Sequence, residues 1–163
     1  MRKITFPIII YITILSSSTK ANFLDFPFGA RARALGSAYT AIADDGTAAF
    51  WNPSGIEGIR IPQSYHMHSP LWLDTYYNCF SYSQLLKGIG NAGLSYCRLD
   101  SGEFIKKTSL FDNEETFSIY HQAIIFTLAG RIVDKYSLGV NFKLINSNIY
   151  DTSAWGFGGD IGF

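Results

Sequence analysis

From about residue 61 to the end of the chain, large apolar side chains recur at every second position. Phe80 and Tyr82 alternate with small or polar residues, and the same alternation runs through residues 136–144 and 155–163. A period of two is typical of β-strands with unlike faces, whereas an amphipathic helix repeats near every 3.6 residues. The sequence therefore predicts an all-β fold over residues 61–163, with one aromatic and aliphatic face and one face of small and polar residues.

Three turns predict how these strands pair. If the chain folds back at residues 87–89, near Val133 and at residues 149–150, the apolar positions of neighbouring strands face one another. A register shift of one residue would mix the two faces, so the pattern specifies the register. The predicted pairs are Phe80 with Tyr96, Tyr82 with Leu94, Ser81 with Ser95 and Cys79 with Cys97 in the first hairpin; Leu128 with Leu138, Phe126 with Val140 and Ile124 with Phe142 in the second; and Phe142 with Phe157 and Val140 with Gly159 in the third.

The polar face and the spacing of the turns favour a transmembrane antiparallel β-barrel. Ser, Gly, Asn and Thr dominate the polar positions, as suits a barrel lumen, whereas a soluble surface carries more Lys and Glu. Charged residues make up 16% of the chain, against about 25% in soluble domains. The connections at residues 87–90 and 134–135 are short and that near residues 100–115 is long and charged, as in outer-membrane barrels. A soluble periplasmic β-sandwich that acts as a binding module remains open, because its strands alternate in the same way.

Residues 1–21 have the three parts of a signal peptide. A short basic start at residues 1–3 precedes an apolar run at residues 4–15 and a small, polar stretch that ends at Ala21. A membrane anchor is the alternative, but a spanning helix needs about 20 apolar residues. The net charge of zero lacks the basic footprint of a nucleic-acid-binding protein. We therefore expect export to the bacterial outer membrane, contact with its lipid, and no nucleic-acid partner.

About six strands fit between Gln63 and Phe163, whereas the smallest single-chain outer-membrane barrels have eight. An open sheet would leave unpaired backbone groups in lipid at several kcal/mol each. We therefore expect an incomplete barrel, from a chain that is the N-terminal fragment of a longer protein. The alternative is that Phe163 is a natural end, since alternating aromatic and aliphatic residues up to a terminal Phe are similar to the signal that ends many barrels.

Residues 22–60 do not follow the period of two. Residues 29–43 are rich in Ala and predict a helix that Gly36 weakens, and residues 44–46 (Asp-Asp-Gly) predict a turn. Thr47 is expected to cap a second short helical piece, and Asn52 to cap a turn or helix that starts at Pro53. The sequence thus predicts an N-terminal helical segment ahead of the strands.

Residues 28–56 resemble the N-terminal signature of the PorV/PorQ family, outer-membrane proteins related to the FadL fatty-acid transporters. The family pattern is Gly-Ala-x-x-x-Ala-(Leu/Met)-Gly, then Ala-x-Ala-Asp-Asp, then (Phe/Tyr)-(Trp/Tyr)-Asn-Pro-Ala-Gly, and Ser54 stands where Ala is commoner. Residues 99–104, 136–141 and 156–162 also resemble family segments. The signature positions of this chain are Gly29, Arg31, Arg33, Gly36, Asp44, Asp45, Asn52, Pro53 and Gly55.

The resemblance implies a barrel at residues 61–163 with residues 22–60 folded inside as a plug, and no enzymatic activity or cofactor. It implies a role in type IX protein secretion or envelope structure, with secretion-system proteins or exported cargo as partners. The alternative is FadL-like passive transport of hydrophobic small molecules across the outer membrane. In such a plug, Arg31 and Arg33 could pair with acidic residues of the lumen or hold the plug in place.

Few residues suggest further chemistry. Cys79 and Cys97 fall opposite each other in the first hairpin and could form a disulfide in an oxidising periplasm, although direct cross-strand geometry is often unsuitable for one. His66 and His68 share a strand face, but no Cys or carboxylate cluster accompanies them, so we expect no metal site. Residues 44–46 lack the repeated acidic spacing of a cation loop. The sequence offers no catalytic residues: it has neither a Gly-x-Ser-x-Gly motif nor a phosphate-binding loop.

Overall fold

The structure is a computed structural model that describes residues 23–106 and 115–163. The predicted signal peptide at residues 1–21 lies outside the described residues. Four short helical segments come first in the described part: η1 (Phe23–Asp25), α2 (Ala30–Ala34), η2 (Ala48–Phe50) and η3 (Pro53–Gly58). The strands are β1 (Gln63–Pro70), β2 (Tyr76–Leu86), β3 (Gly90–Lys106), β4 (Glu115–Val133), β5 (Tyr136–Ile149) and β6 (Thr152–Gly162).

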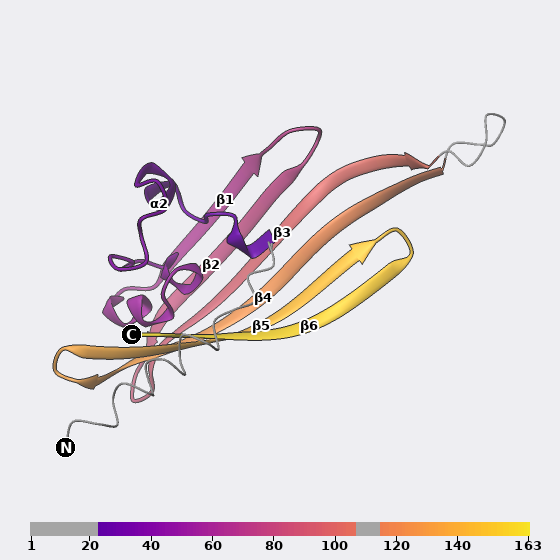
Figure 1. Cartoon of the computed structure of the whole chain (residues 1–163). Coiled ribbons are helices and arrows are strands. Elements are labelled where there is room, and N and C mark those ends of the chain that lie inside the picture. Colours follow the sequence, from indigo (N-terminus) through magenta and orange to yellow (C-terminus); the bar gives the residue numbers. More distant parts are fainter. Residues whose placement is uncertain (1–22, 107–114) are drawn as a thin grey trace, which may run out of the picture.

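The six strands form one antiparallel sheet in which each strand pairs with the next along the chain (Figure 1). The predicted all-β fold, with about six strands from Gln63 onward, is confirmed. The expected long connection near residues 100–115 is partly wrong, because residues 103–106 continue β3 past a bulge after Asp100 and pair with β4. The bulge lets the strand continue through Gly102, whose φ is 76°. The rest of that connection, residues 107–114, lies outside the described residues.

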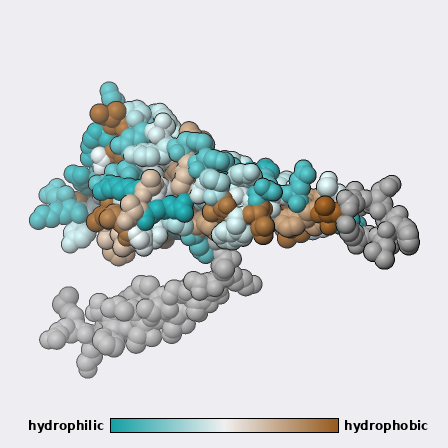
Figure 2. All heavy atoms as spheres, turned by 90° about the horizontal axis from the view of Figure 1, so that it is seen from above, coloured by the Kyte–Doolittle hydropathy of each residue, from teal (hydrophilic) through white to brown (hydrophobic). Residues whose placement is uncertain are grey.

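The two faces of the sheet differ as the alternation predicts. One face, called the outer face, carries large apolar side chains that are exposed; the other, the inner face, carries the buried ones. Figure 2 shows hydrophobic residues along one side of the narrow part of the sheet and hydrophilic residues along the other. Exposed on the outer face are Phe80, Tyr82, Leu94, Ile124, Phe126, Leu128, Leu138, Phe142, Trp155, Phe157 and Ile161. Buried on the inner face are Tyr77, Cys79, Ser81, Ser83, Asn91, Ser95, Cys97, Ala123, Ile125, Thr127, Ala129 and Asn141.

The register of the first predicted hairpin is confirmed, with Phe80 opposite Tyr96 and Cys79 opposite Cys97. The other two registers are wrong by two residues, because each turn is centred one residue later than predicted, at residues 134–135 and 150–151. Tyr150 adopts a positive φ of 56°, as a tight two-residue turn requires. A shift of two keeps every side chain on its predicted face. The observed pairs are Leu128 with Val140, Phe126 with Phe142, Ile124 with Leu144, Leu144 with Phe157, Phe142 with Gly159 and Val140 with Ile161.

The N-terminal segment (residues 23–60) is less helical than predicted. The helix expected over residues 29–43 is confined to Ala30–Ala34, because Gly36 and Ser37 both adopt positive φ and end it. Thr47 precedes η2 without a capping hydrogen bond from its side chain, so that prediction is wrong. Asn52 does cap η3, which starts at Pro53, as predicted. The segment is therefore a chain of turns, whose backbone groups need partners from elsewhere.

These partners come from the inner face of the sheet, over which the N-terminal segment lies (Figure 1). The last described residue, Phe163, returns to the same region, where its carbonyl oxygen accepts a hydrogen bond from Asn52. Because the segment lies on the inner face alone, the sheet has one covered face and one uncovered face.

Among the described residues, no helix has the length and apolar character needed to span a membrane.

Candidate functional site: the N-terminal segment on the inner face

Polar side chains of the inner face bind the backbone of the N-terminal segment. Ser81 Oγ donates to the carbonyl oxygen of Gly46 at 2.5 Å, Asn91 Nδ2 to that of Ile59 at 2.7 Å, and Asn141 Nδ2 to that of Ala49 at 2.8 Å. The three side chains come from β2, β3 and β5 and are at most 2% exposed. Buried carbonyls without partners are costly, so these donors allow an irregular segment to be buried on the sheet.

Apolar contacts accompany these hydrogen bonds in two clusters. One joins segment residues to Ala129 of β4, and the other joins Phe23 and Phe28 to Tyr77 and the cysteines. Trp51 strengthens the packing, because its indole Nε1 donates to the carbonyl oxygen of Phe28 at 2.9 Å. The segment is thus held by apolar burial as well as by polar donors.

Arg31 forms its ion pair within the N-terminal segment, with Asp44, rather than with an acidic residue of the strands. Its guanidinium donates to Asp44 and to the hydroxyl of Tyr39, and lies 3.9 Å from a carboxylate oxygen of Asp45. The hydrogen bond to Asp44 raises the pKa of Arg31, and burial raises the pKa of the Tyr39 phenol. Arg31 and Asp44, two signature positions 13 residues apart in the sequence, therefore form an ion pair within the segment.

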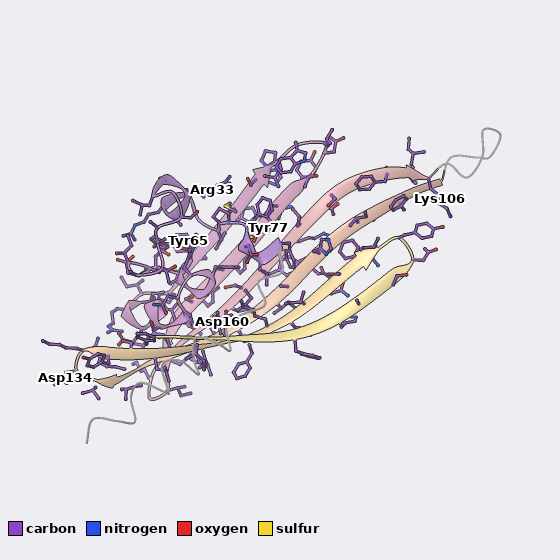
Figure 3. The ribbon with its side chains drawn as sticks, viewed as in Figure 1. Arg33, Tyr65, Tyr77, Lys106, Asp134 and Asp160 are labelled. Atoms are coloured by element: carbon purple, nitrogen blue, oxygen red, sulfur yellow. The ribbon has the colours of Figure 1, made fainter. Side chains whose placement is uncertain are left out.

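Arg33 has the role of attaching the segment to the sheet. Its Nη1 donates to Ser69 Oγ of β1 at 3.0 Å (Arg33 is labelled in Figure 3). This hydrogen bond fits the alternative in which the arginine holds the segment in place, with a hydroxyl of β1 as its partner. Of the two arginines, Arg33 makes the contact that joins segment and strand.

The Asp-Asp-Gly turn forms as predicted and holds the start of η2. Asp45 Oδ1 accepts from the backbone N–H and the hydroxyl of Thr47, at 2.8 and 2.6 Å. The N–H of Gly46 donates to Gln63 Oε1 of β1 at 2.9 Å. Within residues 23–106 and 115–163, no group of His, Cys, Asp and Glu side chains is arranged to hold a metal ion.

Close contacts between backbone atoms explain why positions 55 and 139 are glycine. A Cβ added to Gly55 would lie 2.0 Å from the carbonyl oxygen of Ala43, and one added to Gly139 of β5 would lie 2.2 Å from backbone atoms of Pro53 and Ser54. Gly29, the remaining signature glycine, precedes α2 with a φ of 97°. The segment therefore rests directly on the backbone of β5.

Asn52 connects two parts of this arrangement. Its Oδ1 accepts from the backbone N–H of Ser54 at 3.2 Å and from the Ser54 hydroxyl at 2.8 Å. Its Nδ2 donates to the carbonyl oxygen of Phe163 at 3.1 Å. The signature pair Asn52-Pro53 thus both starts η3 and binds the chain just after β6.

Glu57 forms a cross-link that the sequence did not reveal. Its carboxylate accepts from Arg131 Nη2 of β4 at 3.1 Å, and from Arg60 at 3.3 Å. Burial alone would raise the pKa of Glu57, but the hydrogen bonds from Arg131 and Arg60 outweigh it and hold the pKa below its usual range. Arg131 lies 74 residues away along the chain, so no local spacing could have indicated the pair.

A cleft of about 780 Å³ lies between the segment and strands β5 and β6. Its lining mixes apolar groups, such as Trp51 and Ile145, with a polar cluster. In that cluster Lys143 Nζ lies 2.7 Å from Asp160 Oδ2, and Asn141 Nδ2 donates to the same oxygen at 2.8 Å. The cleft could hold an elongated molecule with an apolar part and a polar end.

The remaining predicted residues are placed as follows. Cys79 and Cys97 lie under the segment as buried free cysteines. His66 and His68 lie two residues apart on β1, opposite Phe80 and Asn78 of β2. His68 Nδ1 is 2.7 Å from Asn78 Oδ1, so His68 has a polar neighbour on the next strand.

Comparisons with protein-family models, with curated proteins and with solved structures found no match to this chain. What defines the site is therefore its geometry: a polar inner face that binds an irregular N-terminal segment, and an apolar outer face left uncovered. All nine signature positions lie in that segment.

We predict that Gly139→Ala weakens the docking of the segment. The added methyl group would collide with backbone atoms of Pro53 and Ser54, and such overpacking costs about 1–3 kcal/mol. The midpoint of thermal unfolding should therefore fall. Gly156→Ala on β6 is the matched control, since no atom lies within 4 Å of its added Cβ, and an equal loss in both variants would contradict the close approach.

We also predict a pH dependence from Glu57. Because its pKa in the folded protein is below the ordinary value of 4.5, the carboxylate stabilises the fold above that pH and loses its contribution as the pH falls through the folded pKa. Glu57→Gln should lower the free energy of unfolding at pH 7 by ~0.2–1 kcal/mol, the range for a partly exposed ion pair, and the difference should vanish at low pH. Glu103→Gln, at an exposed site of β3, is the control; a Glu57→Gln deficit that persists at low pH would refute the ion pair.

Proposed function

We propose that this chain forms part of the wall of an outer-membrane β-barrel of PorV/PorQ type, with its N-terminal segment as a plug, and serves protein secretion or envelope structure without catalysis. The observation that carries the proposal is the inverted polarity of the sheet. The outer face exposes Phe126 and Phe142 at 54% and 63%, while Ser81 and Asn91 of the inner face are buried. Lipid contact is the environment that stabilises such an outer face.

The height of the apolar band matches a membrane-spanning strand. On β5 it runs from Tyr136 to Leu144, and on β4 from Ile124 to Ile132, nine residues in each case. A barrel strand crosses a bilayer with about 9–11 residues. The bands therefore have the length of the hydrocarbon core.

A row of polar side chains borders the band on the outer face. Gln122 Oε1 accepts from the Tyr96 hydroxyl at 2.9 Å, Gln122 Nε2 donates to Asn146 Oδ1 at 3.2 Å, and Asn146 Nδ2 donates to Ser153 Oγ at 2.8 Å. Trp155, directly opposite Asn146 in the sheet, is 64% exposed. Tyr and Trp beside polar groups are typical of the membrane–water interface, so this row supports a border between bilayer and water at this end of the apolar band.

Charged residues at the ends of the strands agree with this placement. Figure 3 shows Asp134, in the turn after β4, and Lys106, at the end of β3, at opposite ends of the sheet. A barrel closes with at least eight strands, so the proposal requires further strands against β1 and β6. The resemblance of residues 28–56 to the PorV/PorQ signature supports the choice of family.

Passive transport of hydrophobic molecules is the second candidate, and the cleft beside β5 and β6 favours it. Its apolar groups, among them Trp51, lie near the polar pair of Lys143 and Asp160, which suits a molecule with an apolar chain and a polar end. Secretion requires no such ligand. The two roles therefore predict different defects in cells that do not assemble the protein: loss of protein release for the first role and loss of uptake for the second.

The test is the substitution Phe126→Lys in the middle of the outer face. A lysine facing lipid near the bilayer midplane costs about 2–4 kcal/mol, so the variant should be depleted from the outer-membrane fraction. Ile89→Lys, in the exposed turn after β2, is the matched control and should assemble normally. A Phe126→Lys variant that assembles as well as the control would contradict a lipid-facing sheet.

The same strains separate the two roles. For a secretion role, cells with Phe126→Lys should retain proteins that control cells release, while uptake of a labelled long-chain fatty acid stays unchanged. Normal release with reduced uptake would instead support the transport role. Unchanged release and uptake in depleted cells would contradict both roles.

A further inference from the structure

The cysteines of β2 and β3 occupy a site that the plug function does not use. Cys79 and Cys97 are direct partners in the antiparallel sheet, and their Sγ atoms lie 2.6 Å apart. A disulfide bond is about 2.04 Å long, so a movement of about half an ångström would join the sulfurs. Opposed residues of antiparallel strands have Cα atoms about 4.5–5.5 Å apart, which lies within the range that disulfides span.

The pair is covered on the side from which a reagent would arrive. Cys79 and Cys97 are 1% and 0% exposed, in a cluster with Phe23 and Phe28 of the N-terminal segment. The hydroxyl of Tyr77 lies 3.4 Å from Cys97 Sγ and 3.5 Å from the carbonyl oxygen of Phe26, and so links the sulfurs to the segment. An incoming thiol or disulfide has no approach while the segment is docked.

We propose that Cys79 and Cys97 form a disulfide before the N-terminal segment docks, and that the docked segment then seals it. The oxidant is a disulfide-bearing thiol oxidant of the exporting compartment. One cysteine thiolate attacks the oxidant's disulfide and releases one thiol; the second thiolate then attacks the mixed disulfide at the protein sulfur and releases the other. Two thiol protons and two electrons thus pass to the oxidant, which ends as two thiols.

The order of events follows from the space each step needs. The mixed disulfide places an oxidant molecule at a sulfur that Phe28 and its cluster cover in the folded protein. The hairpin of β2 and β3 is a local structure that aligns the cysteines without the segment. Bridging before docking is therefore the accessible order, and it makes the bridge resistant to reductants afterwards.

Thiol labelling of the full chain in whole cells tests the bridge. Cells are quenched with acid, the protein is denatured, and free thiols are labelled with a maleimide polymer that shifts the gel band. We expect no label without prior reduction and two labels after it, since the chain has two cysteines. A chain that takes up one or two labels before reduction overturns the proposal.

The inference rests on the export part of the proposed function, because disulfides persist in oxidising compartments. The fraction that holds the protein is therefore measured in the same cells. A bridged chain found outside the outer membrane would count against the barrel and support the bridge. A chain that is found in the outer membrane but is labelled before reduction would support the barrel and count against the bridge.

The seal is tested on the folded, bridged protein with a water-soluble phosphine. Phe28→Ala should speed reduction about tenfold or more, because loss of a buried ring makes local opening more frequent. Phe126→Ala, on the outer face, is the matched control and should leave the rate unchanged. Equal rates in the two variants and the unchanged protein would overturn the sealing by the segment.

Discussion

Burial of the inner face depends on hydrogen bonds between its polar side chains and the carbonyl groups of an irregular segment. Ser81, Asn91 and Asn141 supply these donors from three strands and are themselves almost completely buried. A segment of turns could not otherwise be buried, because its backbone satisfies few of its own groups. The small and polar residues of this face therefore help to specify the fold, as an apolar core does in other proteins.

This arrangement determines what the other face can be. Side chains alternate along each strand, so a face given to polar donors leaves the large apolar residues, such as Phe126 and Phe142, on the opposite side. There they form a band nine residues high, bordered by the polar row that includes Gln122 and Asn146. The proposed contact with lipid gives these residues the apolar surroundings that the described part of the chain does not provide.

The sequence contained the period-two alternation, and with it the all-β fold, the two faces and the register of the Cys79–Cys97 hairpin. Later registers were missed by two residues, because the alternation is unchanged by that shift and only the turn position decides it. The helix predicted after Gly29 was too long, since tertiary contacts override propensity in a segment with Gly36. Contacts such as Glu57 with Arg131 depend on the assembled fold and have no local signal.

Fluorescence quenching by lipids brominated in the middle of their chains tests the central claim, that the outer face contacts lipid while the segment does not. The reporters are Trp51 alone, with Trp72 and Trp155 changed to Phe, and the same protein with Phe126→Trp added. The account predicts weak quenching of Trp51, which lies in the segment, and strong quenching of the emission added at position 126. Equal, weak quenching of both would contradict a lipid-facing outer surface and favour a soluble sheet.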